Sequence, residues 1–215
     1  KTIIDAKTGI TYHSRNGAVQ ESRHVFLESG LKYFLNRTGR DGASILEIGF
    51  GTGLNFLLSA EYCLQNKIRL QYTGIEAHPF PADLIRQSDY YRYVSRAIWD
   101  SFNLSYGQSF RQEITIASFI QLRIIQQELL AFESARSFDI VYFDAFAAVH
   151  QPEMWTIQSL DHISRFLQPG GVFVTYAMNG NLRRNMTALG FRLEKVPGAP
   201  GKREMLRAIK NGNLY

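Results

Sequence analysis

A glycine-rich loop between an apolar strand and a helix places the strongest constraint on how this chain folds. Residues 47–53 read Glu-Ile-Gly-Phe-Gly-Thr-Gly, and they link the aliphatic stretch 44–48 to the helical stretch 54–64. Glycine lets a backbone turn tightly and lets a ligand approach without a Cβ in the way. Open α/β sheets bind ligands at the carboxyl ends of their strands. The strand, loop and helix together therefore predict a ligand site on an α/β sheet.

Strand-like and helix-like segments alternate along the rest of the chain. The expected strands cover residues 44–48, 70–75, 113–116, 138–143, 172–176, 191–196 and 205–209, and the expected helices cover 16–35, 54–64, 119–132, 152–167 and 181–189. This alternation, with early strands that are nearly all apolar, is typical of a parallel sheet covered on both faces. The short linker between the last two strands predicts an antiparallel pair at one edge. We therefore predict one α/β domain over residues 1–215, with a mostly parallel, doubly wound sheet.

The composition agrees with a packed domain and disfavours several other classes of protein. Hydrophobic residues make up 45% of the chain and charged residues 20%, which allows a core and disfavours disorder. No apolar run reaches the length of a membrane span, and no leader-like segment opens the chain. The single cysteine, Cys63, predicts a buried structural thiol and a reducing, cytoplasmic setting. None of the five histidines has a metal-ligand spacing, so no metal is expected.

Acidic residues around the loop indicate which cofactor it holds. Glu76 ends the second expected strand, where its carboxylate would accept both hydroxyls of an adenosine ribose. The loop spacing is Gly-x-Gly-x-Gly, which departs from the Gly-x-Gly-x-x-Gly loop that cradles a dinucleotide pyrophosphate. Glu47 would repel a pyrophosphate but suits the cationic methionine end of S-adenosylmethionine. We therefore favour S-adenosylmethionine over a nicotinamide cofactor, and a tight turn without a ligand is the third interpretation.

Another acidic residue, Asp144, ends the apolar stretch 138–143. An aspartate at such a strand end points into the ligand crevice, where it would hold an acceptor nucleophile near the methyl group of the cofactor. The alternative is a loop or capping aspartate that satisfies backbone N–H groups. The same two interpretations apply to Tyr176, which ends the next strand.

Positive charge is concentrated near the C-terminus. The net charge is +5, and residues 181–215 hold +6 while the preceding residues sum to −1. A local excess of this kind is typical of a polyanion-binding surface, and a solvated basic surface is the alternative. The stretch Tyr90-Tyr91-Arg92-Tyr93, with Arg96 and Trp99, mixes rings and cations in a way that suits base stacking, although core packing explains it more simply.

Several segments in the same order resemble one family. They are residues 17–26 (Gly-Ala-Val-Gln-Glu-Ser-Arg-His-Val-Phe), 46–55 (Leu-Glu-Ile-Gly-Phe-Gly-Thr-Gly-Leu-Asn), 144–147 (Asp-Ala-Phe-Ala), 152–156 (Pro-Glu-Met-Trp-Thr), 183–184 (Arg-Arg), 195–198 (Lys-Val-Pro-Gly) and 201–206 (Gly-Lys-Arg-Glu-Met-Leu). Together they resemble the methyltransferase domain of the bacterial tRNA enzyme that makes 5-methylaminomethyl-2-thiouridine. The resemblance spans nearly the whole chain.

The resemblance implies a fold, a reaction and a set of site residues. The fold would be a class I Rossmann-like methyltransferase, and the reaction would be N-methylation, by S-adenosyl-L-methionine, of the 5-aminomethyl group of (2-thio)uridine at the tRNA wobble position. Asp144 would be the catalytic residue. The implied cofactor contacts are Glu47, Gly49, Phe50, Gly51, Thr52, Gly53, Asn55 and Glu76. The implied contacts to the tRNA anticodon stem-loop are Tyr176, Arg183, Arg184, Lys202 and Arg203.

Two features depart from the family pattern. Residues 148–151 (Ala-Val-His-Gln) stand where the family usually shows Pro-x-Lys-Asn, so a usual lysine is absent. The position after the third strand, which often carries an aspartate toward the adenine, is expected at Ala117-Ser118. Because the chain ends just after the C-terminal signature, it resembles the stand-alone form, without a flavin-dependent oxidase domain.

Two other classes of function stay open. A small-molecule N-methyltransferase or a polyamine-synthase-like enzyme would use the same fold, but it would not need the basic C-terminal segment. A non-catalytic RNA-binding module would keep that segment. The presence of the acidic residues and glycines of the predicted site argues against the non-catalytic module.

Overall fold

The computed structural model describes residues 15–201 and 203–212. The strands are β1 (Gly42–Ile48), β2 (Arg69–Ile75), β3 (Ile114–Ala117), β4 (Ile120–Ile125), β5 (Phe138–Phe143), β6 (Leu167–Thr175), β7 (Phe191–Pro197) and β8 (Glu204–Lys210). The α-helices are α1 (Arg15–Ser22), α2 (Tyr33–Thr38), α3 (Leu54–Gln65), α4 (Ala82–Arg86), α5 (Arg96–Ser109), α6 (Ile157–Ser164) and α7 (Gly180–Ala188). A π-helix, η1 (Arg23–Lys32), and the short 3-10 helices η2 (Tyr90–Arg92), η3 (Leu129–Ala131) and η4 (Pro152–Trp155) complete these elements.

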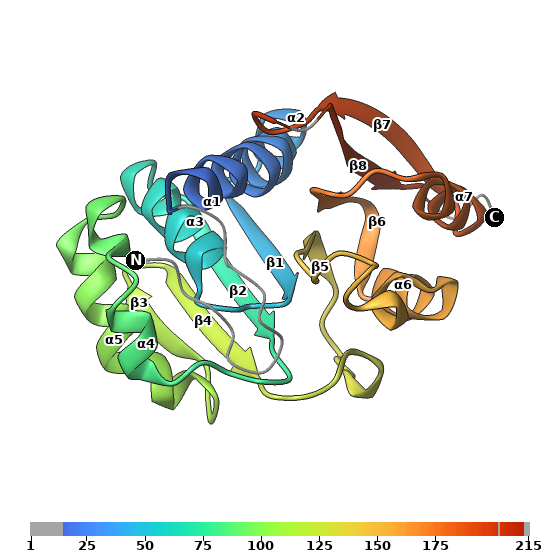
Figure 1. The fold of residues 1–215 in the computed structure, drawn as a ribbon. Coiled ribbons are helices and arrows are strands. Elements are labelled where there is room, and N and C mark those ends of the chain that lie inside the picture. Colours follow the sequence, from blue (N-terminus) through green and yellow to red (C-terminus); the bar gives the residue numbers. More distant parts are fainter. Residues whose placement is uncertain (1–14, 202, 213–215) are drawn as a thin grey trace.

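The strands form one eight-stranded sheet with the order β3-β4-β2-β1-β5-β6-β8-β7 (Figure 1). The five neighbouring strands β4, β2, β1, β5 and β6 are parallel. The pairs β3–β4, β6–β8 and β8–β7 are antiparallel. The predicted mostly parallel sheet and its antiparallel C-terminal edge pair are confirmed. Because β8 runs against β6, with Thr175 opposite Leu206, the turn that joins β7 to β8 lies at the carboxyl edge of the parallel strands.

Successive side chains of the central strands enter two different hydrophobic cores, one on each face of the sheet. In β1, Ile45 packs in the core that contains η1, α3 and α5, whereas Leu46 and Ile48 belong to the core that contains α6 and α7. The pleat of a strand sends neighbouring side chains to opposite faces. Glu47 therefore shares the face of Ile45, which is the face covered by η1, α3 and α5.

The N-terminal helical stretch lies close against the sheet. It runs through α1, η1 and α2, and its middle is wound as a π-helix in which the Tyr33 N–H donates to the Glu28 carbonyl, five residues back. A Cβ on Gly30 would stand 2.8 Å from Cε1 of Tyr142 in β5, so glycine permits this close approach. The prediction of a helix over residues 16–35 is confirmed, and the approach brings the end of α1 beside α3.

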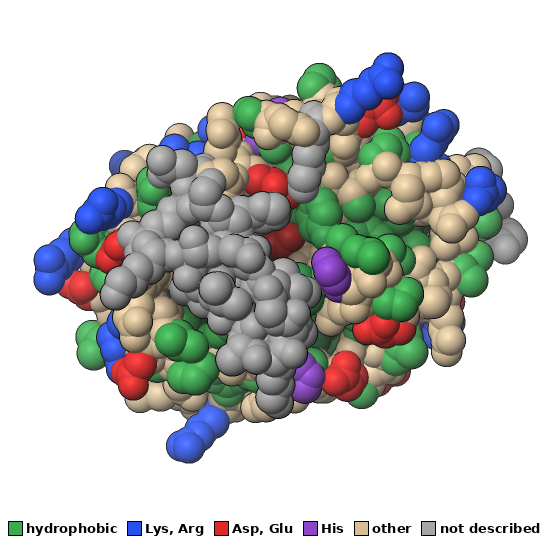
Figure 2. Space-filling model, viewed as in Figure 1, with side chains coloured by type: hydrophobic (Ala, Val, Ile, Leu, Met, Phe, Trp, Pro, Cys, Tyr) green, Lys and Arg blue, Asp and Glu red, His purple; other side chains and the backbone are tan. Residues whose placement is uncertain are grey.

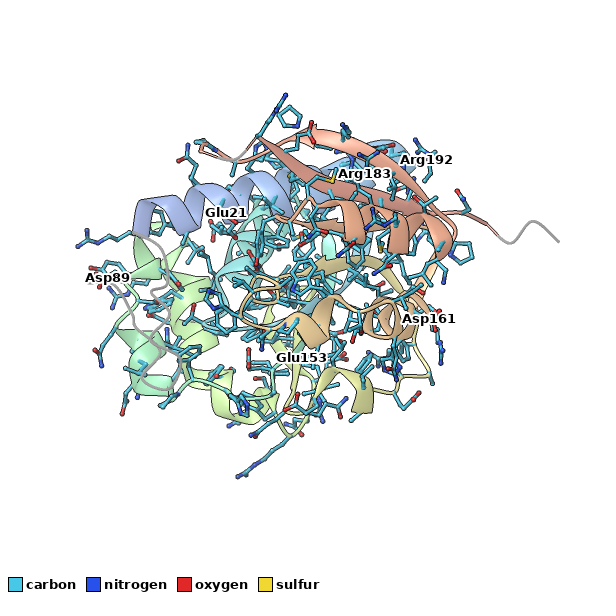
Figure 3. All side chains as sticks on the ribbon, turned by 45° about the vertical axis from the view of Figure 1, so that its right-hand side comes forward. Glu21, Asp89, Glu153, Asp161, Arg183 and Arg192 are labelled. Atoms are coloured by element: carbon cyan, nitrogen blue, oxygen red, sulfur yellow. The ribbon has the colours of Figure 1, made fainter. Side chains whose placement is uncertain are left out.

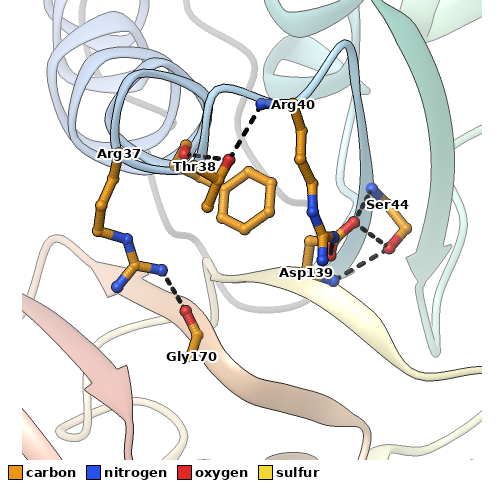
Figure 4. A network of polar contacts seen from close by, with 7 residues as sticks. Arg37, Thr38, Arg40, Ser44, Asp139 and Gly170 are labelled. Carbon is orange, nitrogen blue, oxygen red and sulfur yellow. Dashed lines mark hydrogen bonds and ion pairs between the residues drawn. The ribbon is translucent and has the colours of Figure 1, made fainter.

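A network of polar contacts lies at the amino-terminal edge of the sheet (Figure 4). This edge is opposite the strand ends at which open α/β sheets bind ligands. Asp139, at the start of β5, accepts from the Arg40 guanidinium at 2.7 Å and from the Ser44 N–H and hydroxyl at 2.8 Å each. The Asp139 side chain is 10% exposed. Arg37 also donates to the Gly170 carbonyl. These bonds satisfy a buried carboxylate and tie β1 to β5.

Replacing Asp139 by alanine is expected to destabilise the fold by about 2 to 4 kcal/mol, because it leaves the Ser44 N–H without its acceptor and removes a buried, hydrogen-bonded charge. Chemical denaturation measures the loss. Asp41→Ala is the matched control, because the Asp41–Arg69 pair is 83% and 71% exposed and such pairs contribute little. Equal stability of the two variants would contradict the prediction.

The prediction of a helix over residues 119–132 is wrong. The structure has β4 followed by η3, and β4 pairs in parallel with β2. Ile120, Leu122 and Ile124 are buried in alternation with partly exposed side chains, which is the period of a strand covered on one face. The other face over β2 and β4 is only partly covered, since the connection after β4 holds the short η3. A pocket of about 390 Å³ lies there, lined by Thr73, Arg123 and Arg136 among others.

The remaining segments differ from expectation in detail. The helix predicted over residues 152–167 divides into η4 and α6, and Leu167 already belongs to β6. Cys63 is buried, as predicted, and burial raises the pKa of its thiol to about 12. Within residues 15–201 and 203–212, no helix combines the length and apolar character that crossing a bilayer requires.

Candidate functional site

The glycine loop has the tight conformation that its sequence predicts. Gly49, Gly51 and Gly53 have φ angles of +83°, +54° and +82°, a region that side chains with a Cβ rarely adopt. A Cβ on Gly49 would stand 2.7 Å from the Asp144 carbonyl oxygen. A Cβ on Gly51 would come no closer than 3.9 Å to its nearest neighbour, the Gly49 oxygen, so Gly51 is the position at which a ligand can approach the backbone.

Glu76 connects the end of β2 to this loop. Its Oε2 accepts from the Gly51 N–H at 2.9 Å, and its Oε1 accepts from the His78 N–H at 3.0 Å. These two backbone bonds fix the carboxylate beside the open glycine. Each carboxylate oxygen retains acceptor capacity for a further hydrogen bond, which is what a pair of ribose hydroxyls requires.

Two residues predicted as cofactor contacts have side chains directed elsewhere. Phe50 is 2% exposed, and its ring packs on Phe56, Tyr72 and Phe102 in the core. Thr52 is 7% exposed and shares a 2.8 Å hydrogen bond with the Tyr90 hydroxyl. The turn of the loop directs both side chains inward, so a cofactor contact from these two residues would come from their backbone. That contact stays a prediction.

A buried hydrogen-bond network joins Glu47, Asn55 and Asp144. Asn55 Nδ2 donates to Glu47 Oε1 at 2.7 Å and to Asp144 Oδ2 at 2.8 Å. The Tyr72 hydroxyl donates to Glu47 Oε2 at 2.8 Å, and the Ser22 hydroxyl donates to Oδ1 of the Asn55 side chain. Glu47 is 0% exposed and Asn55 is 5% exposed. In the structure Asn55 bridges Glu47 and Asp144, and the predicted contact of Glu47 and Asn55 with the cofactor stays a prediction.

The environment of Glu47 favours its neutral form. Burial raises the pKa of this carboxyl well above its ordinary value, and the nearby charges of Asp144 and Glu76 raise it further. The hydrogen bonds from Asn55 and Tyr72 act in the opposite direction. Glu47, Asp144 and Glu76 thus bring several carboxyl groups to the site. On the face drawn in Figure 2, acidic side chains lie both near the middle and along the rim, whereas Lys and Arg lie mainly along the rim.

The segment after Asp144 is held by hydrogen bonds to its backbone. The Tyr176 hydroxyl donates to the Ala145 carbonyl at 2.9 Å, and Trp155 Nε1 donates to the Phe146 carbonyl at 2.8 Å. Gln151 accepts from the Phe146 N–H at 3.1 Å. Burial, followed by the charge of Asp144, raises the pKa of Tyr176. Tyr176 therefore supports the segment that follows Asp144, and its contact to the substrate stays a prediction.

The basic C-terminal residues divide into two groups. Arg192 and Arg207 each lie 2.7 Å from the Glu194 carboxylate, and Lys195 lies 3.6 Å from Glu204. By contrast, Arg183, Arg184 and Arg203 are exposed, and within the described part of the chain no carboxylate pairs with them. Arg183 on α7 and Arg192 on β7 lie on the C-terminal side of the molecule (Figure 3). Lys202 lies outside the described residues.

The aromatic stretch after α4 packs mainly inward. Trp99 is 9% exposed, and the rings of Tyr90 and Tyr91 lie 6.4 Å from it. Only the Tyr91 ring, which is 46% exposed, and the neighbouring Arg92 lie at the surface among the residues 90–93. Core packing thus accounts for most of this stretch.

Because β4 is not predicted from the sequence, the residue expected nearest the adenine is placed at the wrong position. The strand beside β2 is β4, which ends at Ile125. The residue that follows it at the carboxyl edge is Gln126, and Ala117-Ser118 instead joins β3 to β4. Sequence reasoning also missed Ser22 and Tyr72, which contact the site through their hydroxyls. No group of three metal-ligating side chains occurs within the described part of the chain.

Solved structures with the same fold include MNMC2 from Aquifex aeolicus, with a TM-score of 0.73 and 22% identity over 96% of this chain and 66% of that one. The N-methyltransferase NodS from Bradyrhizobium japonicum has a TM-score of 0.53 and 19% identity, over 93% of this chain and all of that one. The predicted class I Rossmann-like methyltransferase fold is therefore confirmed.

The similar sequences described next are all MnmC proteins. A tRNA 5-methylaminomethyl-2-thiouridine biosynthesis bifunctional protein, MnmC, of Pseudomonas savastanoi pv. phaseolicola is 31% identical over 91% of this chain and 31% of its own length. MnmC of Magnetococcus marinus is 32% identical over 94% of this chain and 32% of its own. The chain thus spans about a third of the length of these relatives. A family model described as S-adenosyl-L-methionine-dependent methyltransferase matches residues 94–211. The chain belongs to the family of S-adenosyl-L-methionine-dependent methyltransferases.

Proposed function

We propose that this chain methylates the amine of a 5-aminomethyl group on (2-thio)uridine at the tRNA wobble position. The observation that carries the proposal is the placement of Asp144. Its backbone N–H donates to the Ile48 carbonyl at 2.9 Å, directly before the glycine loop, and its carboxylate is held by Asn55. The similarity to MnmC supports the substrate. A tRNA substrate implies a cytoplasmic enzyme, and we infer one methyltransferase domain over residues 1–215.

The residues around the loop fit S-adenosyl-L-methionine. Gly51 offers an open backbone position, and Glu76 offers acceptor capacity for the ribose hydroxyls. We assign Gly49 and Gly53 to the shape of the loop, and Gln126 to the strand end nearest the adenine. When bound, the cofactor supplies a methyl group that its sulfonium already activates, so the protein mainly aligns donor and acceptor.

Asp144 acts on the acceptor amine. The amine must be neutral to attack, and a site with little water favours its uncharged form. Asp144 would accept a hydrogen bond from the amine and so orient the nitrogen lone pair. Its negative charge would also stabilise the positive charge that develops on nitrogen during the transfer.

Glu76→Ala is expected to weaken S-adenosylhomocysteine binding about tenfold or more, because two hydrogen bonds to ribose hydroxyls are each worth about 1 kcal/mol. Glu76→Gln keeps one carbonyl acceptor and should lose less. Calorimetry measures both, with thermal melting to establish that the variants are folded. Binding of NAD with no binding of S-adenosylhomocysteine would contradict the cofactor assignment of these residues.

Mass spectrometry of wobble nucleosides tests the proposed reaction. Cells without the gene are expected to accumulate the aminomethyl nucleoside and to lack its methylated product. Purified enzyme, added with the cofactor to tRNA from those cells, should restore the product. Identical nucleosides in the two strains, together with no transfer to that tRNA, would refute the proposal and favour a small-molecule acceptor.

A further inference from the structure

We propose that Asn55 is a positioning residue, whose one side-chain amide holds the carboxyl groups of Asp144 and Glu47 together at the methyl-transfer site. The inference rests on the proposed function, because it takes Asp144 as the residue that contacts the acceptor amine. It assigns to Asn55 a role distinct from cofactor contact.

Every polar atom of the Asn55 side chain takes part in a hydrogen bond. An amide nitrogen carries two hydrogens, and Nδ2 donates to Glu47 at 2.7 Å and to Asp144 at 2.8 Å. The amide oxygen accepts from the Ser22 hydroxyl. Because ionised carboxylates only accept hydrogen bonds, the two acids select the orientation in which both amide hydrogens face them, and the amide oxygen then accepts from Ser22.

The fold places these two acids so close together that their negative charges repel each other. Glu47 lies on β1 and Asp144 follows β5, and β1 pairs with β5 so that Ile48 stands opposite Phe143. Two like charges on adjacent strand ends repel each other, and burial of one of them adds a desolvation cost. The Asn55 amide lies between the two carboxyl groups and donates a hydrogen bond to each. These bonds offset both the repulsion and the desolvation cost.

Other ionisable groups surround the pair on several elements. Tyr72 of β2 donates to Glu47, and Glu76 at the end of β2 adds negative charge. Tyr142 of β5 is close enough to interact electrostatically with Glu47. On the Asp144 side, Tyr176 interacts with both Asp144 and Glu21 of α1. Burial and the acidic neighbours raise the pKa of Glu47, whereas the hydrogen bonds from Asn55 and Tyr72 lower it. Asn55 is therefore one of the two side chains that favour ionised Glu47.

This arrangement matters for the reaction because positioned charge stabilises a transition state without reorganisation. The Asp144 carboxylate can rotate about its own side-chain bonds, and the bond to Asn55 removes that freedom. Glu47 is fully buried and anchors the Asn55 amide. Asn55 thus acts through Asp144 rather than on the reacting atoms.

The test compares Asn55→Ala with the wild type in two measurements. In the first, the side-chain carboxyl carbon signals of Glu47 and Asp144 are followed against pH by NMR, without RNA. The pKa of Glu47 is expected to rise in the variant, because the lost bond favours the ionised form. In the second, kcat for methyl transfer should fall roughly tenfold to hundredfold, as for a misplaced catalytic group, while KM for S-adenosyl-L-methionine changes little.

Ser59→Ala is the matched control, since Ser59 is a buried polar residue of the same helix that bonds to Tyr142 and to neither acid. It should leave both measurements unchanged. An unchanged Glu47 titration in folded Asn55→Ala would overturn the proposal. Should that variant not fold, Asn55→Asp keeps the size of the side chain but removes both amide hydrogens, and a titration identical to wild type would overturn the proposal equally. The titration needs no substrate, so failure of the proposed tRNA reaction is recognised separately.

Discussion

Asp144→Ala is expected to reduce kcat for methyl transfer roughly hundredfold or more, because it removes both the group that orients the amine and the charge that stabilises its cation. Asp144→Asn keeps the shape of the side chain and can still accept from Asn55, so it separates the loss of charge from the loss of geometry. Single-turnover transfer from labelled cofactor to substrate tRNA measures both variants.

Binding and stability serve as controls for this result. Asp144 does not line the open side of Gly51, so S-adenosylhomocysteine affinity should be largely preserved. Asp139→Ala, at the other end of the same strand, should lose stability while retaining kcat under conditions where it is folded. Wild-type turnover by Asp144→Ala would show that Asp144 only completes the loop, and the proposed mechanism would then be wrong.

The double variant Arg183→Ala, Arg184→Ala is expected to weaken tRNA binding strongly and to make it less sensitive to salt. Each phosphate contact releases counterions, so the slope of log affinity against log salt should flatten by about one unit per lost contact. Both arginines are exposed, and they follow β6 at the edge of the sheet where Asp144 lies. Filter binding over a salt series measures affinity and slope together.

A second double variant with the same change in charge provides the control. Arg136 and Arg165 are 62% and 67% exposed, but they precede β5 and β6 and so lie toward the opposite edge of the sheet. Alanine at both positions should change tRNA affinity and slope little. Equal effects of the two double variants would show that only net charge matters. The Lys202→Ala, Arg203→Ala variant tests the β7–β8 turn in the same way, and S-adenosylhomocysteine binding should be unaffected throughout.

The local sequence is sufficient to predict the conformation of the glycine loop and the edge of the sheet at which the acidic residues lie. The three loop glycines have positive φ angles, as the spacing predicts, because only glycine adopts that region without strain. Glu47, Glu76 and Asp144 meet at one edge because parallel strands end on the same side of a sheet. The charge count alone also indicates a basic C-terminal segment, although it does not show which cations pair with neighbouring carboxylates.

Only the tertiary structure decides the partners of these residues. The helix predicted over residues 119–132 is wrong because a strand covered on one face mixes apolar and polar side chains much as an amphipathic helix does, and the partner strand β2 resolves the ambiguity. Phe50 turns inward because Gly74 of β2 leaves room for its ring, with a Cβ there 2.3 Å from Phe50 Cδ2. The Ser22–Asn55 and Asn55–Asp144 bonds span 33 and 89 residues. Hydrogen-bond partners so far apart in the chain are set by how α1, α3 and the β5 end pack together, which no local pattern encodes.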